Sequence, residues 1–431
     1  MQRLKKLGIF FLILLALAAV GLLVLYGVGQ SKLASRGGGA IPTADELVYP
    51  DLTDDENAAI LYRAAWNTLK DTPEGTSDDA QMLVSEYTKT ILARQQGETS
   101  EEALSDEDIQ FVGVLLADAD PAFEILRQVR DTKGALFLND HSPASTLQNQ
   151  KDMEKVGTWM RGLARYVAAR ALWESEQGNT DASLDWVATG LRLSNDLTNE
   201  TVLIGEMVRA AIALQMLSAA QGTLYDHPLS EPVPHALLDE LNDVRDRKHH
   251  GNSLRREAVF SEALMQAQGM FTLGGIWKAN YLESFGAFIK AVEEDDYTER
   301  TRMLAEWSDD VARSSKGVTK FLHVLDSIMM PGLARSDDAL ERLIAESDLL
   351  ELALALRAYE QTHGVFPETL ADLAPEFLLA LPQDPLNGKQ YPYEKTAEHI
   401  TVRSEEKDRR GDEIAFHLKP IANGVGASDE Q

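Results

Sequence analysis

The sequence predicts a mainly α-helical protein with an N-terminal transmembrane helix, an irregular body of helical hairpins, and a small C-terminal α+β module with a short antiparallel sheet. Three observations predict this fold. An uncharged run of 23 residues lies near the N-terminus. Apolar residues then recur at helical spacing from residue 54 to residue 363. After residue 364, turn residues and short alternating segments replace that spacing.

The uncharged run, Leu7–Gly29, is long enough to cross a bilayer, because about 20 helical residues at about 1.5 Å each span the hydrocarbon core. Three cations precede it, and this bias predicts a cytoplasmic N-terminus. We therefore expect a basic cytoplasmic segment over residues 1–6 and a single-pass anchor over residues 7–29. The anchor would lie in the inner (cytoplasmic) membrane, with the C-terminal domain in the periplasm.

The same run has a second interpretation as a cleaved signal sequence, with Gly27 and Gly29 as a small-residue site before Gln30. The apolar core of a signal sequence usually has about 7–15 residues, which is shorter than this run, so we favour the uncleaved anchor. A lipid anchor on cysteine is excluded, because the chain contains no cysteine.

The rest of the chain is strongly acidic. All 69 Asp and Glu follow residue 44, whereas five of the 41 Lys and Arg precede residue 37, which leaves a net charge of −33. Such a surface repels nucleic acid and anionic lipid, so we expect no nucleic-acid partner. The absence of cysteine excludes disulfides, thiolate metal sites and a cysteine nucleophile, and it suits an oxidising envelope compartment.

Residues 30–53 are expected to be a linker, in which Gly37–Gly39 predicts a flexible stalk. A helical body follows over residues 54–335. Its first helix should start at Asp54 or Asp55, either of which can serve as the N-cap. The residues expected on the buried face of this helix are Ile60, Leu61, Ala64 and Ala65.

The clearest part of the body is a helical hairpin, with helices over Val156–Gln177 and Ala182–Leu197. It resembles one tetratricopeptide-type unit, but no second copy recurs at a period of about 34 residues, so a regular array is not predicted. Further helices are predicted over Asp78–Gln95, from Asp106 with Pro121 as a break or a new helix start, over Leu203–Thr223, and over Leu237–Gln268 as one helix or a pair. A loop is expected over Lys133–Gln150 and a turn over Met329–Gly332.

The C-terminal module is expected over residues 336–420. A helix over Asp337–His363 should end at Gly364, a left-handed cap. Three short strands should follow, and residues 421–431 should be a disordered tail. The predicted strands are Gln390–Glu394, His399–Ser404 and Glu413–Leu418.

Within this module, a helix ends in Gly364-Val365-Phe366-Pro367, a short Leu-rich segment follows, and Asp384-Pro385 leads into the predicted sheet. This order resembles the C-terminal module of the major pseudopilins of type II secretion, in which a long helix ends in a glycine–x–aromatic–proline turn. The resemblance extends over residues 348–418 and implies a small antiparallel sheet. Loops of that family can bind calcium, and the resemblance points to Asp384 and Asp412 as the acids for it.

The remainder of the chain departs from that family, whose helix is itself the membrane segment. In this chain some 300 residues separate the predicted membrane segment from the helix of the C-terminal module. The family carries a glutamate five residues after a processed glycine, whereas Ile13 stands five residues after Gly8, so filament assembly is not implied. Taken whole, the chain resembles uncharacterised membrane-anchored envelope proteins of Gram-negative bacteria, and this resemblance implies no activity.

One polar cluster is the candidate site: His250, Arg255, Arg256 and Glu257. If these side chains converge on a concave surface, they form a polar site in a helical groove. The alternative is a set of exposed side chains with intrahelical ion pairs, which contribute little to stability. The sequence assigns no catalytic and no cofactor-binding residue.

Other motifs have structural interpretations. His249 and His250 point about 100° apart on a helix, so we expect an exposed pair rather than metal ligands. Glu293–Asp296 lacks the alternating spacing of a calcium loop and predicts a solvated face or helix end. Gly269–Gly275 has no phosphate-loop pattern and predicts a hinge or loop. Apart from the calcium that the family resemblance raises, no metal ion and no cofactor is expected.

Three functions stay open. We favour a membrane-anchored envelope protein whose helical ectodomain is an interaction scaffold for a protein partner, without enzymatic activity. The C-terminal module favours an accessory component of a secretion or pilus-like system instead. The third hypothesis is an envelope hydrolase with an unrecognised carboxylate or histidine site in a helical cleft.

Overall fold

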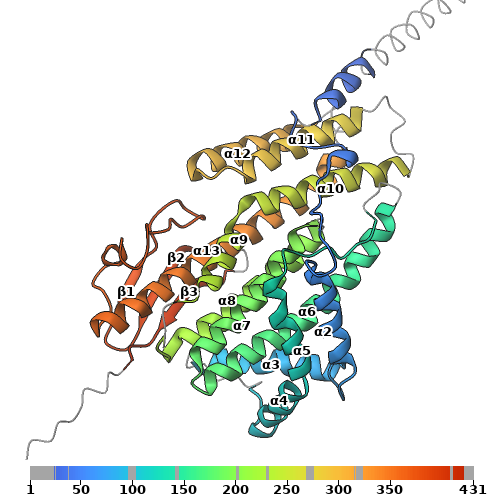
Figure 1. The fold of residues 1–431 in the computed structure, drawn as a ribbon. Helices are drawn as coiled ribbons and strands as arrows, with labels where there is room; N and C mark the ends of the chain where they lie inside the picture. Colours follow the sequence, from blue (N-terminus) through green and yellow to red (C-terminus); the bar gives the residue numbers. More distant parts are fainter. Residues whose placement is uncertain are drawn as a thin grey trace, which may run out of the picture. The chain divides into compact units, whose positions relative to one another are not determined.

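The computed structural model describes residues 24, 26–36, 38–95, 103–140, 145–199, 203–229, 233–267, 276–314, 316, 324–407 and 411–421. In these residues the protein is mainly helical, with a small C-terminal three-stranded antiparallel sheet (Figure 1). The predicted cytoplasmic segment, most of the predicted anchor, the predicted loop at 269–275 and the predicted tail from 422 onward lie outside the described residues. Residues 26–35, at the end of the predicted anchor and beyond it, are helical.

The chain divides into two compact units, each built from separated segments. Unit 1 comprises residues 1–48, 140–150 and 247–335, and unit 2 comprises residues 49–139, 151–246 and 336–431. The expected boundary between residues 335 and 336 is a point where the chain passes from unit 1 to unit 2. The expected helical body over 54–335 is not one unit, however, because its segment 247–335 belongs with the N-terminal residues.

Unit 1 is built on α10 (Arg247–Ala267), α11 (Ile276–Val292) and α12 (Tyr297–Ser314). The predicted helix or pair over 237–268 is a pair, since α9 ends at Arg245 and α10 starts at Arg247. Phe288 of α11 packs against Trp307 of α12 with the two rings tilted and their centroids 4.7 Å apart. Aromatic burial of this kind holds α11 against α12.

The predicted flexible stalk is wrong for the described residues of the segment. The Gly38 carbonyl oxygen accepts a hydrogen bond from Lys290 Nζ at 3.1 Å, and the Ala40 carbonyl oxygen accepts one from Arg255 Nε at 3.1 Å. Ile41 is buried. The glycines predict a flexible backbone here. Hydrogen bonds from side chains of α10 and α11 to its carbonyl oxygens order that backbone instead.

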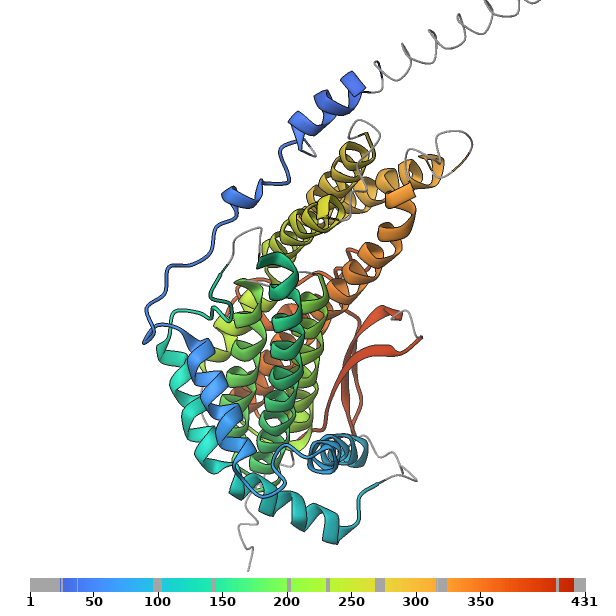
Figure 2. The same ribbon diagram turned by 90° about the vertical axis from the view of Figure 1, so that its right-hand side faces the viewer.

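Unit 2 contains most of the other helices. They are α2 (Ala58–Lys70), α3 (Asp78–Gln95), α4 (Asp106–Asp118), α5 (Asp120–Arg127), η2 (Gln128–Asp131), α6 (Thr146–Glu176), α7 (Thr180–Asn195), η4 (Asp196–Asn199), α8 (Leu203–Asp226), α9 (His235–Arg245), α13 (Val324–His363) and η6 (Leu370–Leu373). The first residues of α6 and α13 belong to unit 1. Helix α7 packs against α8 and α9, and α2 packs against α5 (Figure 2).

The first predicted helix exists, but its cap and its buried face differ from the prediction. Asn57 is the N-cap, because its side chain accepts a hydrogen bond from the Ala59 amide at 3.0 Å. The buried face carries Ala58, Ala59, Tyr62, Ala65 and Leu69, whereas Ile60 is 43 % exposed. The large Tyr62 ring fixes which face turns inward, and periodicity alone did not reveal it.

Two predicted breaks do not exist. Helix α6 starts at Thr146, inside the predicted loop over 133–150. Helix α13 runs without a break from Val324 through Pro331, so the predicted turn over 329–332 is wrong. A proline removes one main-chain hydrogen bond, a cost that the remaining bonds of a 40-residue helix outweigh.

The predicted small antiparallel sheet is present, although the bounds of its first two strands differ from the prediction. Its strands are β1 (Tyr393–Lys395), β2 (Ile400–Lys407) and β3 (Glu413–Leu418), in the order β1-β2-β3. Val402 of β2 pairs with Tyr393 and with Phe416. Alternate residues of β3 are buried, whereas β2 buries the consecutive residues Ile400, Thr401 and Val402. Gly364 has the positive φ of 75° that its capping role needs.

Among the described residues, one helix is long and apolar enough to cross a membrane by length and composition, namely α8. Half of its apolar window is buried within unit 2. It packs against α7, α3 and β3, so its apolar side chains serve the core of that unit.

Candidate functional site

A groove of about 1080 Å³ lies in unit 2, between α8, α13 and the sheet. Its lining residues are Leu217, Ser218, Gln221 and Tyr225 of α8, Arg342, Glu346 and Leu349 of α13, and residues 397–399, 412–417, 419 and 420 of the sheet region. Most neighbouring lining positions on each helix are three or four residues apart, so each helix presents one face to the groove.

The groove has a mainly polar lining above buried apolar side chains. Leu349, Ile414 and Phe416 are buried at its base, whereas Glu413 and Lys419 are exposed. On its α13 wall, Arg342 Nε and Glu346 Oε1 form an ion pair at 2.7 Å. Polar groups that converge on a concave surface can orient a bound ligand.

Two histidines line the groove. Thr401 Oγ1 and His417 Nδ1 are hydrogen-bonded at 3.0 Å, and Thr396 Oγ1 and His399 Nδ1 at 3.2 Å. Burial lowers the pKa of His417, Glu413 opposes this effect, and His399 adds to it. His417 is therefore neutral near pH 7, and a neutral imidazole can accept a proton or a hydrogen bond.

The outer edge of β3 faces the groove. Within the described sheet β3 is a terminal strand, and the Ala415 carbonyl oxygen accepts a hydrogen bond from Gln221 Nε2 at 3.3 Å. Farther along, the Lys419 amide donates to the Tyr225 carbonyl oxygen at 2.6 Å. A side-chain amide thus covers a carbonyl that another strand would otherwise pair, and an incoming polypeptide can replace it.

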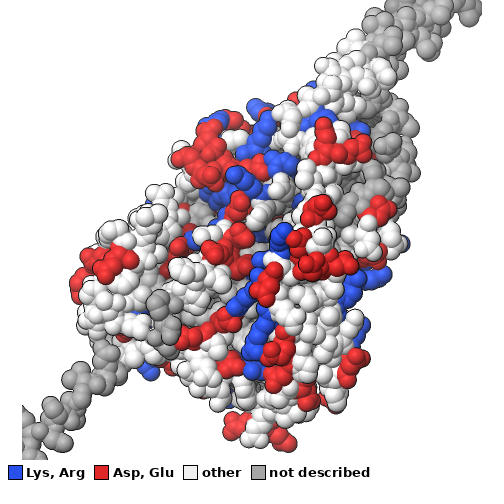
Figure 3. Space-filling model, viewed as in Figure 1, with Lys and Arg blue, Asp and Glu red and all other residues white. Residues whose placement is uncertain are grey.

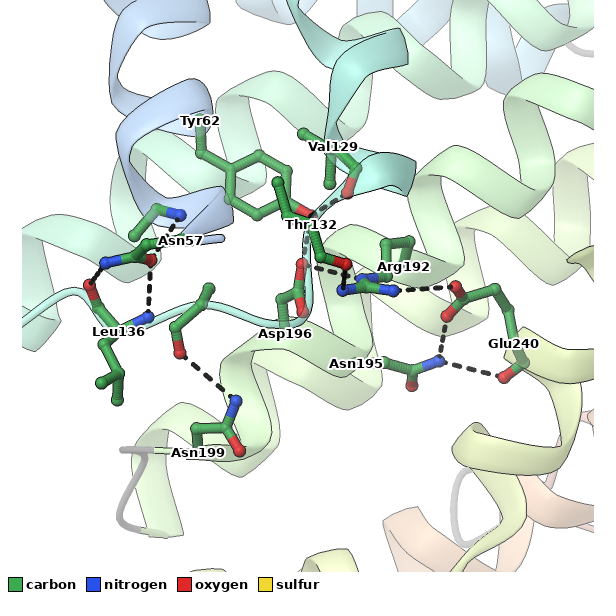
Figure 4. Close-up of polar contacts among 12 residues, drawn as sticks. Asn57, Tyr62, Val129, Thr132, Leu136, Arg192, Asn195, Asp196, Asn199 and Glu240 are labelled. Carbon is green, nitrogen blue, oxygen red and sulfur yellow. Dashed lines mark hydrogen bonds and ion pairs between the residues drawn. The ribbon is translucent and has the colours of Figure 1, made fainter. Parts of the chain in front are cut away.

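A second polar assembly lies in the interior of unit 2 (Figure 4). Tyr62 Oη of α2 donates to Asp196 Oδ2 at 2.7 Å, and Arg192 Nε of α7 donates to the same oxygen at 3.0 Å. Arg192 also faces Glu240 Oε1 of α9, at 3.9 Å. Asn195 Nδ2 donates to Glu240 Oε2 at 2.7 Å.

This buried network is structural in character. Burial raises the pKa of Asp196 and raises the pKa of Glu240 to about 7, although Asn195 and Arg192 oppose the latter shift. Tyr62 is fully buried and Asp196 nearly so. Its members link α2, α7 and α9 through charge-assisted hydrogen bonds, and none of them lines the groove.

A third assembly joins α9 to the C-terminal module. Arg245 Nη1 of α9 donates to Asp348 Oδ1 of α13 at 3.1 Å and also pairs with Glu351. Tyr391 Oη donates to Asp348 Oδ2 at 3.0 Å. Burial raises the pKa of Asp348 to about 6, and Arg245 and Tyr391 oppose that shift.

The structure separates the four residues of the predicted cluster. His250 and Glu257 lie on the buried stripe of α10, because a separation of seven residues returns to the same face. Arg255 and Arg256 line a hollow of about 700 Å³ with residues 34–36, 39–42 and 46–48. The four side chains therefore do not converge on one surface, and the predicted exposed histidine pair is wrong because His250 is fully buried.

The described contacts of the cluster differ from those expected. Arg255 forms a bidentate pair with Glu293, at 2.5 and 2.7 Å, across 38 residues of sequence. Glu257 Oε1 accepts a hydrogen bond from Ser261 Oγ at 3.0 Å. Glu293 was predicted only as part of a solvated acidic run, and a pair between two helices leaves no local sequence signal.

Of the two candidate calcium ligands, Asp384 forms hydrogen bonds within the C-terminal module. Asp384 is fully buried, and its oxygens accept hydrogen bonds from the Leu386 amide, Asn387 Nδ2 and Ser404 Oγ at 3.0, 2.9 and 2.6 Å. Asp412 is exposed. In the described ranges, no group of three or more histidine or acidic residues is placed to hold a metal ion. Asp296 caps α12 by accepting from the Glu299 amide at 2.8 Å, as a helix end should.

Sequence reasoning missed both the groove and the buried network. The histidines of the groove were visible, but only the register of β2 and β3 brings them beside α8 and α13. Arg192 and Asp196 were the one available signal for the network, since residues four apart pair on a helix. No family model, curated protein or solved structure matches the chain.

Proposed function

We propose that the protein is a single-pass inner-membrane protein of a Gram-negative envelope, whose helical ectodomain binds an extended segment of a protein partner. The groove of unit 2 is the binding site in this proposal. The observation that carries it is the edge of β3, which meets the groove and is covered by the Gln221 side chain.

The anchor half of the proposal rests on the sequence. The run over residues 7–29 has no charge, three cations precede it, and the acidic residues all follow residue 44. The helix over residues 26–35 is consistent with a span that continues beyond the membrane. Carbonate extraction together with N-terminal sequencing tests it. A mature chain that starts near Gln30 contradicts the anchor.

The binding half rests on the chemistry of the groove. Main-chain hydrogen bonds to a strand edge give affinity for a polypeptide, and polar side chains around that edge can select its side chains. Glu346, His399 and His417 are such lining residues.

Ser218, a half-buried residue of α8 in the groove, offers a test of partner binding. Ser218→Trp should fill the groove and abolish partner cross-linking. The matched control is Ser85→Trp, at a half-buried serine of α3 that belongs to the same unit and does not line the groove. The control should leave cross-linking unchanged. Equal loss in both variants, or no loss in Ser218→Trp, would contradict the groove as the binding site.

A second candidate is an accessory role in a secretion or pilus-like system. The order of elements supports it, namely a long helix, a glycine cap, a short helical turn and a three-stranded sheet. Cross-linking of the groove to a secretion component would favour this function over a general scaffold. A partner outside such machinery would count against it.

A hydrolase remains the third candidate, because His417 and Glu413 line a groove with other acids. A neutral histidine in a cleft can serve as a general base. His417→Gln should then remove turnover of an envelope substrate by the purified protein. If no turnover is found, or if it survives this substitution, the hydrolase is contradicted.

A further inference from the structure

We propose that unit 1 is seated directly on the membrane, with the α11–α12 face beside Lys32 against zwitterionic phospholipid headgroups. This inference rests on the anchor in the proposed function. It adds a lipid surface as a second partner, distinct from the protein partner of the groove.

Charged side chains fasten the segment after the anchor to unit 1. Lys32 Nζ donates to Glu283 Oε2 of α11 at 2.5 Å and to Asn280 Oδ1 at 3.3 Å. Arg36 Nη2 donates to Glu262 Oε2 of α10 at 2.9 Å, and Lys278 of α11 pairs with the same carboxylate. The ion pairs of Lys32 and Arg36 thus join the juxtamembrane segment to the helices of unit 1.

The backbone that follows is held as well. Lys290 Nζ donates to the Gly38 carbonyl oxygen, and Arg255 Nε donates to the Ala40 carbonyl oxygen. Glu293 fixes the Arg255 guanidinium by a bidentate pair. Several charge-assisted contacts over residues 32–40 leave no free stalk in the part that the structure describes.

The position of these contacts sets the distance to the membrane. Residues 26–35 are helical, so Lys32 lies about 5 Å beyond Gly29, the last residue of the anchor. The headgroup layer on each side of the hydrocarbon core is about 5–7 Å thick. The first ion pair therefore lies within the headgroup layer, and it brings the part of α11 around Glu283 there.

The surface of unit 1 at this place has balanced charge, unlike the acidic chain as a whole. A second groove, of about 850 Å³ and belonging to unit 1, runs between α11, α12 and the segment that holds Ser35 and Gly38. Its charged residues are Lys290, Arg302 and Arg313, with Glu283, Glu306 and Asp310. Both signs are visible on the surface in Figure 3.

A zwitterionic headgroup matches this surface. In the structure Arg302 pairs with Glu306 and Arg313 pairs with Asp310, both at the surface. A zwitterionic headgroup can exchange with such exposed pairs, its phosphate with an arginine and its ammonium group with a carboxylate. Met303, Trp307 and Val311 line the same groove and give an apolar surface at interfacial depth, where tryptophan is favoured. The anionic headgroup of phosphatidylglycerol lacks an ammonium group and would leave the carboxylates opposed to negative charge.

The absence of native cysteine permits a direct test with a single label. Ala287 of α11 is exposed and lines this groove. The full-length Ala287→Cys protein, carrying a fluorophore, is reconstituted into phosphatidylethanolamine–phosphatidylcholine vesicles that contain a headgroup-quencher lipid. We expect strong quenching, which Lys32→Glu should reduce several-fold by repulsion from Glu283. Combining Lys32→Glu with Glu283→Lys should restore it.

The outcomes separate this inference from the anchor. If carbonate extraction releases the protein from the vesicles, both the anchor and the contact of unit 1 with the membrane are contradicted. If the protein stays in the membrane but its fluorophore is only weakly quenched, the contact of unit 1 with the headgroups is contradicted and the anchor is not. The same holds if Lys32→Glu and the double charge swap leave the quenching unchanged. Circular dichroism shows whether each variant is folded. If Lys32→Glu does not fold, the Lys32→Glu/Glu283→Lys double variant, which restores the ion pair, still provides the test. Equal quenching in pure phosphatidylglycerol vesicles would overturn the preference for zwitterionic lipid.

Discussion

The buried guanidinium of Arg357 donates hydrogen bonds from Nε and Nη2 to the carbonyl oxygen of Leu224, at 2.9 and 2.7 Å. Nη2 also donates to the Tyr225 carbonyl oxygen at 2.6 Å, and Nη1 donates to Glu360 Oε2 at 2.6 Å. The last carbonyls of a helix have no intrahelical partner and carry partial negative charge. Arg357 of α13 therefore completes the C-terminal end of α8, beside the groove residue Tyr225.

We predict that Arg357→Leu destabilises the protein by about 3–5 kcal/mol, because it leaves the buried Glu360 carboxylate without its cation. The matched control is Arg313→Leu, since Arg313 and Asp310 form an exposed pair of the same spacing. The control should cost at most about 1 kcal/mol. Urea unfolding of the detergent-solubilised chain measures both, and equal costs would contradict the role of Arg357.

Glu240 should make stability depend on pH. Burial raises its pKa from an ordinary value of 4.5 to about 7, so the folded state holds this proton more tightly than the unfolded state. The contribution of Glu240 to stability is complete below pH 4.5 and is lost as the pH rises to 7. Glu240→Gln removes that loss, so the variant should be more stable at pH 8 by at most about 3 kcal/mol.

The measurement for Glu240 is the free energy of unfolding between about pH 5 and pH 8, for the parent and the Glu240→Gln chain. The two curves should converge near the acidic end and separate toward the alkaline end. A variant that is less stable than the parent at pH 8 would show that the Arg192–Glu240 attraction outweighs the cost of burial.

Gly190 sets the close approach of α7 to α8. A Cβ atom there would lie 2.0 Å from Met216 Sδ and 2.7 Å from Met216 Cγ. We predict that Gly190→Ala costs about 1–3 kcal/mol by overpacking. In a Met216→Ala background the cost should fall. A double-mutant cycle measures the difference, and an unchanged cost would mean that Met216 is not the obstacle.

Calcium should not change the stability of the C-terminal module. The Asp384 oxygens already accept three hydrogen bonds, so a cation would have to displace them. The melting temperature should be the same in millimolar calcium and in chelator. A rise in calcium that disappears in Asp384→Asn would contradict this interpretation.

Elements whose bounds depend on nearby residues could be predicted from the sequence. The helix over Asp78–Gln95 and the strand over Glu413–Leu418 were predicted at both ends. Gly364 was predicted as a cap because glycine adopts the left-handed conformation at no steric cost. These features depend on neighbours within a few residues.

Where distant residues decide the structure, the prediction failed. The ordered segment around Gly38 depends on Lys290, which lies 252 residues away. Arg255 was assigned to a cluster with its sequence neighbours, yet it pairs with Glu293. Charge at helical spacing indicates what can pair within one helix, but it does not identify a partner on another helix.

The most direct test of the central claim places a photo-cross-linking residue at Gln221, in the groove, in living cells. The matched control is Val114, a surface residue of α4 in the same unit. The proposed function predicts a discrete cross-linked product from position 221 that Ser218→Trp abolishes, and none from position 114. Equal products from both positions, or none from position 221, would contradict a partner in the groove.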